Sequence, residues 1–262
     1  MTTLLERLMA RAIADQREES SFFQTLLNAT IYAHIPLTDR VNSHSDRIRF
    51  VQFHRPDNGQ LTLPFFTDLK KARFAAQSNV RIIALKGRAF LELTRGATLM
   101  LDPNDNGCTL YPEEVEALLL TGQVAVIQPF TVEEESMPLV GPPQDSSSWL
   151  IDALIPPLAK LPFVQVAYLG GVFSRTEVPE QTGLLIVVGG EQAHAERAVH
   201  AVLTAIQPLA AKHEEMPIDI THFDPTENVP AWITHIALQP FYEREWGARF
   251  HLDDGRHKPS SV

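Results

Sequence analysis

The sequence predicts an α+β protein of two compact domains, each a mixed sheet covered by helices. Three observations lead to this prediction. Helical and strand-like patterns follow one another without the strict alternation that a doubly wound parallel sheet requires. A stretch rich in proline, serine and glutamate interrupts the chain near its middle. The length of 262 residues suits two domains of ordinary size.

The first domain opens with apolar residues at helical spacing, which predict a helix over 3–19 that continues into a second one over 22–27. Alternating patterns then predict strands over 30–35, 47–54, 61–66, 80–85 and, as the last, 97–101. A hairpin turn at Asp57-Asn58-Gly59 joins the second strand to the third, because Asn and Gly tolerate the positive φ of such turns. Helices are predicted over 67–77, capped by Thr67, over 88–94, ended by Gly96, and over 111–121.

The linker is predicted over residues 132–148, where three adjacent glutamates repel one another and three prolines deny helix and ladder hydrogen bonds. In the second domain we expect a helix over 149–161, strands over 163–173 and 183–188, a long helix over 191–212, and strands over 217–223 and 234–239. The resulting domain boundaries are 1–131, 132–148 for the linker, 149–252, and 253–262 for a flexible tail.

The net charge of −10 is unevenly distributed along the chain. Residues 1–131 are neutral, the linker carries −4, and residues 149–262 carry −6. Nucleic acid and anionic membrane both need a basic surface, so neither is expected as a partner. An acidic surface steers a basic protein partner, although it also serves simply to keep an acidic domain in solution.

Cysteine usage and the N-terminus predict a cytoplasmic protein. A single cysteine excludes an intramolecular disulfide and any cysteine-built zinc cluster, and it suits a reducing compartment. No apolar run approaches the ~20 residues that cross a bilayer, and Glu6 and Arg7 stand where a signal peptide needs an apolar core. No cofactor is predicted.

One segment fits the spacing of a calcium-binding loop. Asp102, Asn104, Asn106 and Glu113 supply oxygen ligands at the positions that such a loop uses. A strand-like run precedes the segment, however, where a calcium loop needs a helix, and two prolines stiffen it. We therefore expect these side chains to cap turns and to begin a helix rather than to hold a metal.

Cysteine, histidine and glycine each offer a weaker candidate. Cys108 lies near a helix start, but its thiol becomes a nucleophile only with a histidine beside it. The histidines His34, His44, His54, His194 and His200 lack the i,i+4 spacing of a helical metal site. The pairs Gly170-Gly171 and Gly189-Gly190 follow strands, yet neither belongs to a phosphate-binding motif. We expect no catalytic or metal residues among them.

Five segments carry a resemblance to a known family; they are residues 63–72, 96–107, 110–119, 162–169 and 240–250. They resemble the N-terminal and C-terminal domains of the enhanced-serine-sensitivity (SseB) family of bacterial proteins. The resemblance implies a cytoplasmic two-domain protein and assigns no calcium role to the segment 102–113. It implies no active site, because the family has no established catalytic residues to carry over.

These observations predict a non-enzymatic interaction or regulatory protein, in its specific form an adaptor or antitoxin-like binder of a basic protein. The residues predicted to contact the partner are Glu214, Glu215, Glu227, Tyr242 and Trp246. Core packing is the favoured explanation of the two aromatic residues. The alternative is an enzyme or small-molecule sensor linked to serine or sulfur metabolism, which would show a pocket with converging polar groups.

Overall fold

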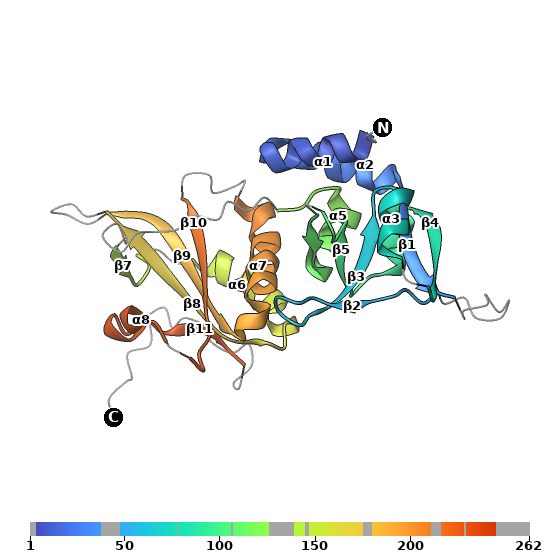
Figure 1. Cartoon of the computed structure of the whole chain (residues 1–262). Coiled ribbons are helices and arrows are strands. Elements are labelled where there is room, and N and C mark those ends of the chain that lie inside the picture. The colour runs from blue at the N-terminus through green and yellow to red at the C-terminus, as the bar shows by residue number, and fades with distance from the viewer. Residues whose placement is uncertain are drawn as a thin grey trace, which may run out of the picture. The chain divides into compact units, whose positions relative to one another are not determined.

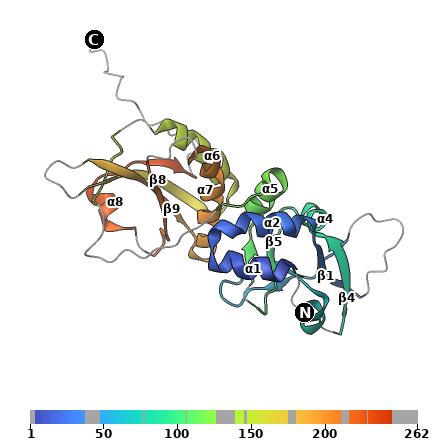
Figure 2. The ribbon, with the colours of Figure 1, turned by 90° about the horizontal axis from the view of Figure 1, so that it is seen from above.

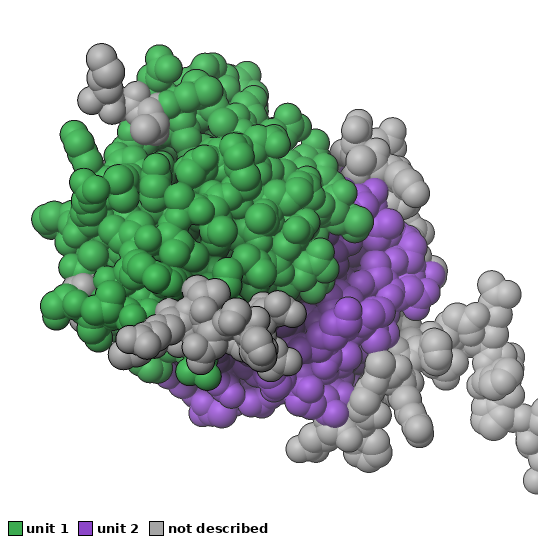
Figure 3. Space-filling model, turned by 90° about the vertical axis from the view of Figure 1, so that its right-hand side faces the viewer, with its two compact units in different colours: residues 1–126 green, residues 127–262 purple. Residues whose placement is uncertain are grey.

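The chain folds into two compact units, residues 1–126 and 127–262 (Figure 3). The computed structural model describes residues 4–37, 48–76, 78–105, 107–125, 139–144, 147–174, 180–210, 216–227 and 229–244. Each unit contains one mixed sheet with helices packed on it (Figure 1). The predicted α+β class is therefore confirmed.

Unit 1 begins with two adjacent helices, as the sequence predicts. They are α1 (Leu4–Ala14) and α2 (Glu19–Asn28), joined by the 3-10 turn η1 (Gln16–Glu18). The two helices run side by side, as Figure 2 shows. Their apolar faces bury Leu5, Phe22 and Leu26 in the core of the unit. Burial of that many large apolar side chains fixes the pair of helices on the sheet.

The sheet of unit 1 has the strand order β4-β1-β3-β5-β6, with β2 also paired to β3. The strands are β1 (Thr30–Pro36), β2 (Phe53–His54), β3 (Leu61–Phe66), β4 (Val80–Lys86), β5 (Thr98–Leu101) and β6 (Thr109–Leu110). Only the β3–β5 pair is parallel. The helices between the strands are α3 (Leu69–Ala75), α4 (Gly87–Leu93) and α5 (Pro112–Thr121).

Three local predictions for unit 1 need correction. Residue 47 of the strand predicted over 47–54 lies outside the described residues. Within 48–54 the strand is reduced to β2, because Val51 donates its backbone N–H to the His34 carbonyl but no ladder forms before Phe53. The hairpin that follows is confirmed, with Gly59 at φ +71°. Asp68 rather than Thr67 caps α3, and the short strand β6 follows the strand predicted to be last.

The sheet of unit 2 has the strand order β10-β9-β8-β11, with β7 also paired to β8. The strands are β7 (Leu139–Gly141), β8 (Val164–Phe173), β9 (Gln181–Gly190), β10 (Ile218–Phe223) and β11 (Pro240–Glu243). Only β9 and β10 run parallel. Alternate residues of β8 and β9 contribute to two different apolar clusters, so both faces of the sheet are covered.

Helices α6 (Ser148–Lys160) and α7 (Ala195–Ala210) cover one face of this sheet, and α8 (Ala231–His235) covers the other. A 3-10 turn, η3 (Gln192–His194), leads into α7. Among the helices that the structure describes, none combines the length and the apolar character needed to span a membrane.

Two predictions for unit 2 are wrong in their details. The strand expected over 234–239 does not form, because Trp232, Ile233 and Ile236 lie at helical spacing and pack α8 onto the sheet. The predicted linker contains a strand, since Leu139–Gly141 pairs antiparallel with the end of β8. The other predicted helices and strands of this unit are present with shifts of a few residues.

Candidate functional site

The segment with calcium-loop spacing contains a buried ion pair. The Asp102 side chain is completely buried, and its carboxylate accepts hydrogen bonds from the Thr67 backbone N–H (3.0 Å), the Thr67 hydroxyl (2.7 Å) and the Lys71 ammonium (2.8 Å). Asn106 lies outside the described residues. Among the residues that are described, no three His, Cys, Asp or Glu side chains are grouped to hold a metal. The carboxylate of Asp102 thus stabilises the turn between β3 and α3 through its hydrogen bonds with Thr67.

Lys71 connects three parts of unit 1. Besides Asp102, its ammonium lies 3.2 Å from Glu6 of α1 and 3.0 Å from Asp105 of the β5–β6 loop. Burial alone would lower the pKa of Lys71, but the hydrogen bonds and charges of these carboxylates outweigh it and raise the pKa above its ordinary value. Lys71, on α3, therefore links α3 to α1 and to the β5–β6 loop through ion pairs.

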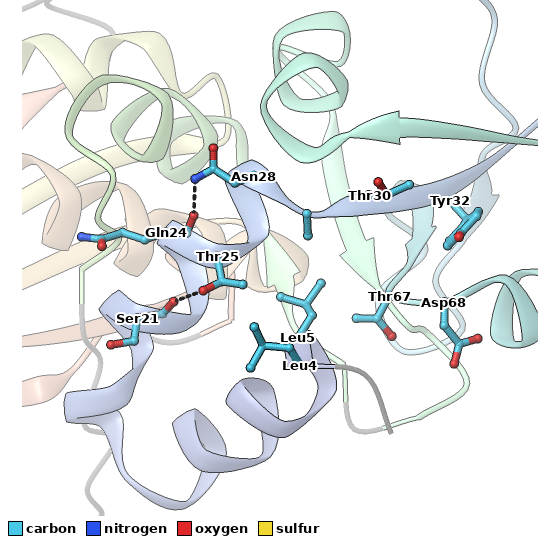
Figure 4. A pocket seen from close by; sticks show the side chains of 11 residues that line it. Leu4, Leu5, Ser21, Gln24, Thr25, Asn28, Thr30, Tyr32, Thr67 and Asp68 are labelled. Atoms are coloured by element: carbon cyan, nitrogen blue, oxygen red, sulfur yellow. Dashed lines mark hydrogen bonds between the residues drawn. The ribbon is translucent and has the colours of Figure 1, made fainter. Parts of the chain in front are cut away.

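Next to these ion pairs, beside the β3–α3 turn, lies an open groove of about 740 Å³ (Figure 4). It is lined by Leu4, Leu5, Ser21, Gln24, Thr25, Asn28, Ala29, Thr30, Tyr32, Thr67 and Asp68. Its polar residues come from α2 on one side and from β1 and the β3–α3 turn on the other. We call Lys71 and its three carboxylates, Glu6, Asp102 and Asp105, the ion-pair cluster. It holds Thr67 in the β3–α3 turn, and through Glu6 it holds α1, the helix that contributes Leu4 and Leu5 to the groove. The volume falls in the ~300–1,000 Å³ range of ligand sites.

The groove offers hydrogen-bonding groups but little charge. Thr25 donates its hydroxyl hydrogen to the Ser21 carbonyl (2.8 Å), and Asn28 donates its side-chain N–H to the Gln24 carbonyl (3.0 Å). Asp68 accepts the Lys71 backbone N–H through Oδ1 at 2.8 Å. It is the one charged side chain among the described residues that line the groove. Such a lining can bind a ligand, but it contains no pair of nucleophile and base.

Cys108 lacks the environment of a catalytic thiol. It is half-buried and packs against the core of unit 1. Burial, assisted by the negative charges of Glu114, Glu19 and Asp102, raises the pKa of the Cys108 thiol to about 12. The thiolate that a nucleophile requires is therefore scarce at neutral pH.

Three of the histidines singled out by the sequence, His34, His54 and His194, make contacts within the fold. The Nε2 of His34 lies 2.8 Å from the Ala72 carbonyl, and the Nδ1 of His54 lies 3.0 Å from the Gly59 carbonyl. His194 stacks on a core phenylalanine, with the ring centroids 4.5 Å apart. Of the remaining two, His200 lies on α7 and His44 lies outside the described residues.

The glycine pairs are explained by close packing within the sheet of unit 2. A Cβ atom at Gly189 would lie 2.6 Å from a methyl carbon of Val166 and 2.8 Å from the ring of Phe223. At Gly170 it would lie 2.9 Å from Val140 of β7. The glycines therefore allow neighbouring side chains to approach the strands, and no phosphate site is needed to explain them.

His222 is a residue that the sequence analysis missed. Both of its ring nitrogens are buried, and neither has a hydrogen-bond partner within the described part of the chain. Burial lowers the pKa of His222, against the opposing charge of Asp224. The sequence pattern that could have indicated its burial is alternation: His222 follows Ile218 and Ile220 at every second position of β10, on the face that packs on the core.

We predict that His222 makes unit 2 less stable in mild acid. In the unfolded chain His222 binds a proton at the ordinary histidine pKa of ~6.5, whereas in the folded unit its pKa is lower. The stability of unit 2 is therefore fully present above pH ~6.5, and it is lost as the pH falls toward the lowered pKa of the folded state. The measurement is urea unfolding at several pH values, followed by tryptophan fluorescence. His222→Leu should reduce this pH dependence, and His235→Gln, a change at an exposed position, should not.

The residues predicted to bind a partner lie in different environments. Glu227 is exposed in the turn after β10, whereas Tyr242 is only 2% exposed and belongs to the core of unit 2. The core explanation therefore fits Tyr242, whose ring is not available as a surface anchor. The other three, Glu214, Glu215 and Trp246, lie outside the described residues.

Two further acidic residues that the sequence analysis missed lie at the same edge of the sheet as Glu227. The Asp224 carboxylate accepts the Gln192 backbone N–H (3.0 Å), which joins the turn after β10 to the segment after β9. Glu191 begins that segment and is exposed. We call Glu191, Asp224 and Glu227 the acidic corner. These residues could have been found from strand direction, because Glu191 follows β9 while Asp224 and Glu227 follow β10, and the carboxyl ends of parallel strands meet at one edge of a sheet.

Comparison with known proteins accounts for most of the chain. Residues 5–117 match the model of the SseB protein N-terminal domain, and residues 132–244 match that of the SseB protein C-terminal domain. Proteins named Protein SseB from Escherichia coli (strain K12) and from Shigella flexneri are each 26% identical to this chain over 247 residues, which is 93% of this chain and 93% of theirs. No solved structure matches.

Proposed function

The chain belongs to the SseB family, and from that premise we propose that it is a non-enzymatic binding protein whose partner is a protein with a basic surface. The observation that carries the proposal is the division of charge. Residues 1–126 are neutral, so the net charge of −10 belongs entirely to residues 127–262. A unit with this excess attracts basic proteins and repels acidic ones.

The acidic corner is the part of unit 2 best suited to such a contact. Hydrogen bonds from Thr226 and from the Gln192 backbone lower the pKa of Asp224, so its carboxylate is charged at neutral pH and fixed in the turn. Glu191 and Glu227 add two exposed carboxylates at the same edge of the sheet. Exposed charges of this kind raise the association rate and select the partner more than they add buried contact energy.

Other features of the chain support binding rather than catalysis. The Cys108 thiol is held in its neutral form, and the Lys71 ammonium is engaged by three carboxylates. The groove of unit 1 presents hydroxyls, amides and one carboxylate. An acyl-transfer or hydrolytic site would place a nucleophile beside a base, and these groups do not form that arrangement.

We predict that reversing the charge of the corner weakens partner binding about tenfold or more at low salt. The variant is Glu191→Lys with Glu227→Lys. Its control is Asp152→Lys with Glu180→Lys, which makes the same change of net charge at exposed positions on α6 and directly before β9. The measurement is capture from a lysate of the source organism, followed by titration of the captured protein at about 50 mM and about 300 mM salt.

Two outcomes would contradict the proposal. In the first, the corner variant retains the captured proteins as well as the wild type does, while the control behaves identically. In the second, the captured proteins are not basic. A saturable rise in melting temperature with serine would instead favour the small-molecule sensor, because a ligand that binds only the folded state stabilises it.

A further inference from the structure

We propose that the groove of unit 1 binds an extended segment of the partner and holds one lysine or arginine side chain of that segment against Asp68. This inference rests on the proposed function, because it takes a basic protein as the occupant. It adds a second contact, made by the neutral unit, to the electrostatic contact proposed for the acidic corner.

The shape of the groove favours a segment of chain. At about 740 Å³ it lies in the upper part of the ~300–1,000 Å³ range of ligand sites, and it is open to solvent rather than enclosed. An enclosed cavity that buries most of its ligand is typical of small-molecule sites. An open groove instead lets a chain enter at one end and leave at the other.

The uncharged lining matches the hydrogen-bonding groups of a peptide backbone. Ser21, Thr30 and Tyr32 provide hydroxyls that both donate and accept, and Gln24 provides a side-chain amide. Asn28 uses a side-chain N–H on its own helix, which leaves its Oδ1 as an acceptor for a peptide N–H. These groups come from both sides of the groove, so a backbone running between them can bond to each (Figure 4).

The charge of the lining selects a cation. Asp68 uses Oδ1 to cap α3, and its other oxygen, Oδ2, is left to accept from an ammonium or guanidinium. Tyr32 also lines the groove and offers its aromatic ring to a bound cation. Leu4, with 58% of its surface exposed, offers apolar area to the stem of a long basic side chain. No Lys, Arg or His is among the described lining residues, so an anionic side chain would find no partner.

The ion-pair cluster prepares the groove for its ligand. Thr67 is fixed by two hydrogen bonds to Asp102, and it directly precedes Asp68. The contact between Lys71 and Glu6 ties down α1, which carries Leu4. A site held in its binding geometry loses less entropy when the ligand arrives.

The test uses an acetylated seven-residue peptide of glycine and serine with one central arginine, titrated into the full-length protein labelled with ¹⁵N. We expect saturable shifts of backbone amide signals in α2, β1 and the β3–α3 turn. A twin peptide with neutral citrulline in place of arginine should bind about tenfold or more weakly, because a charged donor bonds more strongly to a carboxylate than a neutral donor does.

Asp68→Asn is the informative variant, because asparagine retains the helix cap while removing the charge. We expect it to bind the arginine peptide as weakly as the wild type binds the citrulline peptide. Glu92→Gln, which removes an exposed carboxylate elsewhere in unit 1, should bind like the wild type. The inference is overturned if Asp68→Asn binds the peptide normally, if the shifted signals lie outside the groove, or if free arginine binds as well as the peptide.

This test is independent of the one for the acidic corner. The variant Glu191→Lys with Glu227→Lys changes unit 2 alone and should bind the arginine peptide normally. If the corner variant loses partner capture and the arginine peptide causes no shift of amide signals, the proposed function is supported and peptide binding in the groove is contradicted. A positive peptide titration together with a corner variant that captures the partner normally would remove the acidic corner as the contact and leave the groove as a binding site.

Discussion

Replacing Lys71 by methionine is expected to lower the free energy of unfolding of unit 1 by about 3–5 kcal/mol. The Asp102 carboxylate is completely buried, and Lys71 is the cation that the structure gives it. Methionine fills the space of the lysine stem but leaves Asp102 with its charge and only the two hydrogen bonds from Thr67. The contacts to Glu6 and Asp105 disappear in the same step.

The measurement is urea unfolding followed by two signals. All three tryptophans lie in residues 127–262, so their fluorescence reports on unit 2 and should not change. The part of the far-ultraviolet circular dichroism that belongs to unit 1 should shift to lower urea. Lys70→Met is the control, because Lys70 is the exposed neighbour of Lys71, and such substitutions usually change stability by only ~0.5 kcal/mol or less. Equal losses in the two variants would contradict the assignment.

A second variant separates loss of the pair from loss of packing. Adding Asp102→Asn to Lys71→Met removes the uncompensated charge, so part of the stability should return. The pH dependence gives a further check. Since the pKa of Lys71 is raised in the folded state, its contribution is fully present below the ordinary lysine pKa of ~10.4. It is lost only as the pH rises through the higher folded value, so the defect of Lys71→Met should be constant across neutral pH.

Sequence patterns predicted those parts of the fold whose signals are local. The strand Thr30–Pro36 and the turn Asp57–Gly59 are examples, because alternation and turn chemistry are visible within a few residues. The strand Leu139–Gly141 was missed, since three residues have no periodicity and β8 supplies their hydrogen bonds from more than 25 residues away. The class of the fold was therefore accessible while its shortest elements were not.

The candidate sites depended on contacts that no local pattern records. Asp102 has the spacing of a calcium ligand, but its partner Lys71 lies 31 positions earlier in the chain. Glu191 and Glu227 come to the same edge of the sheet only because β9 and β10 run parallel and Asp224 bonds to Gln192. Residue type and spacing thus indicated which side chains were polar and exposed, and the topology decided which of them meet.

The Cys108 thiol is expected to react with iodoacetamide at least about 100-fold more slowly in the native protein than in the unfolded chain. Only the thiolate reacts, and an unperturbed cysteine has a pKa of ~8.5. With the pKa raised to about 12 in the folded unit, the thiolate fraction near pH 8 falls by about three orders of magnitude. Since this is the single cysteine of the chain, the mass of the intact protein reports the reaction without ambiguity.

Slow labelling in the native protein then proceeds through transient opening of unit 1, so its rate follows the stability of that unit. Lys71→Met should accelerate it by a factor of about 100 or more, in proportion to the predicted loss of 3–5 kcal/mol. Lys70→Met should leave the rate unchanged. If Cys108 instead reacts in the wild type as fast as a free thiol, the thiolate is present in the folded protein. Cys108 would then be available as a nucleophile, and a purely binding role would lose part of its support.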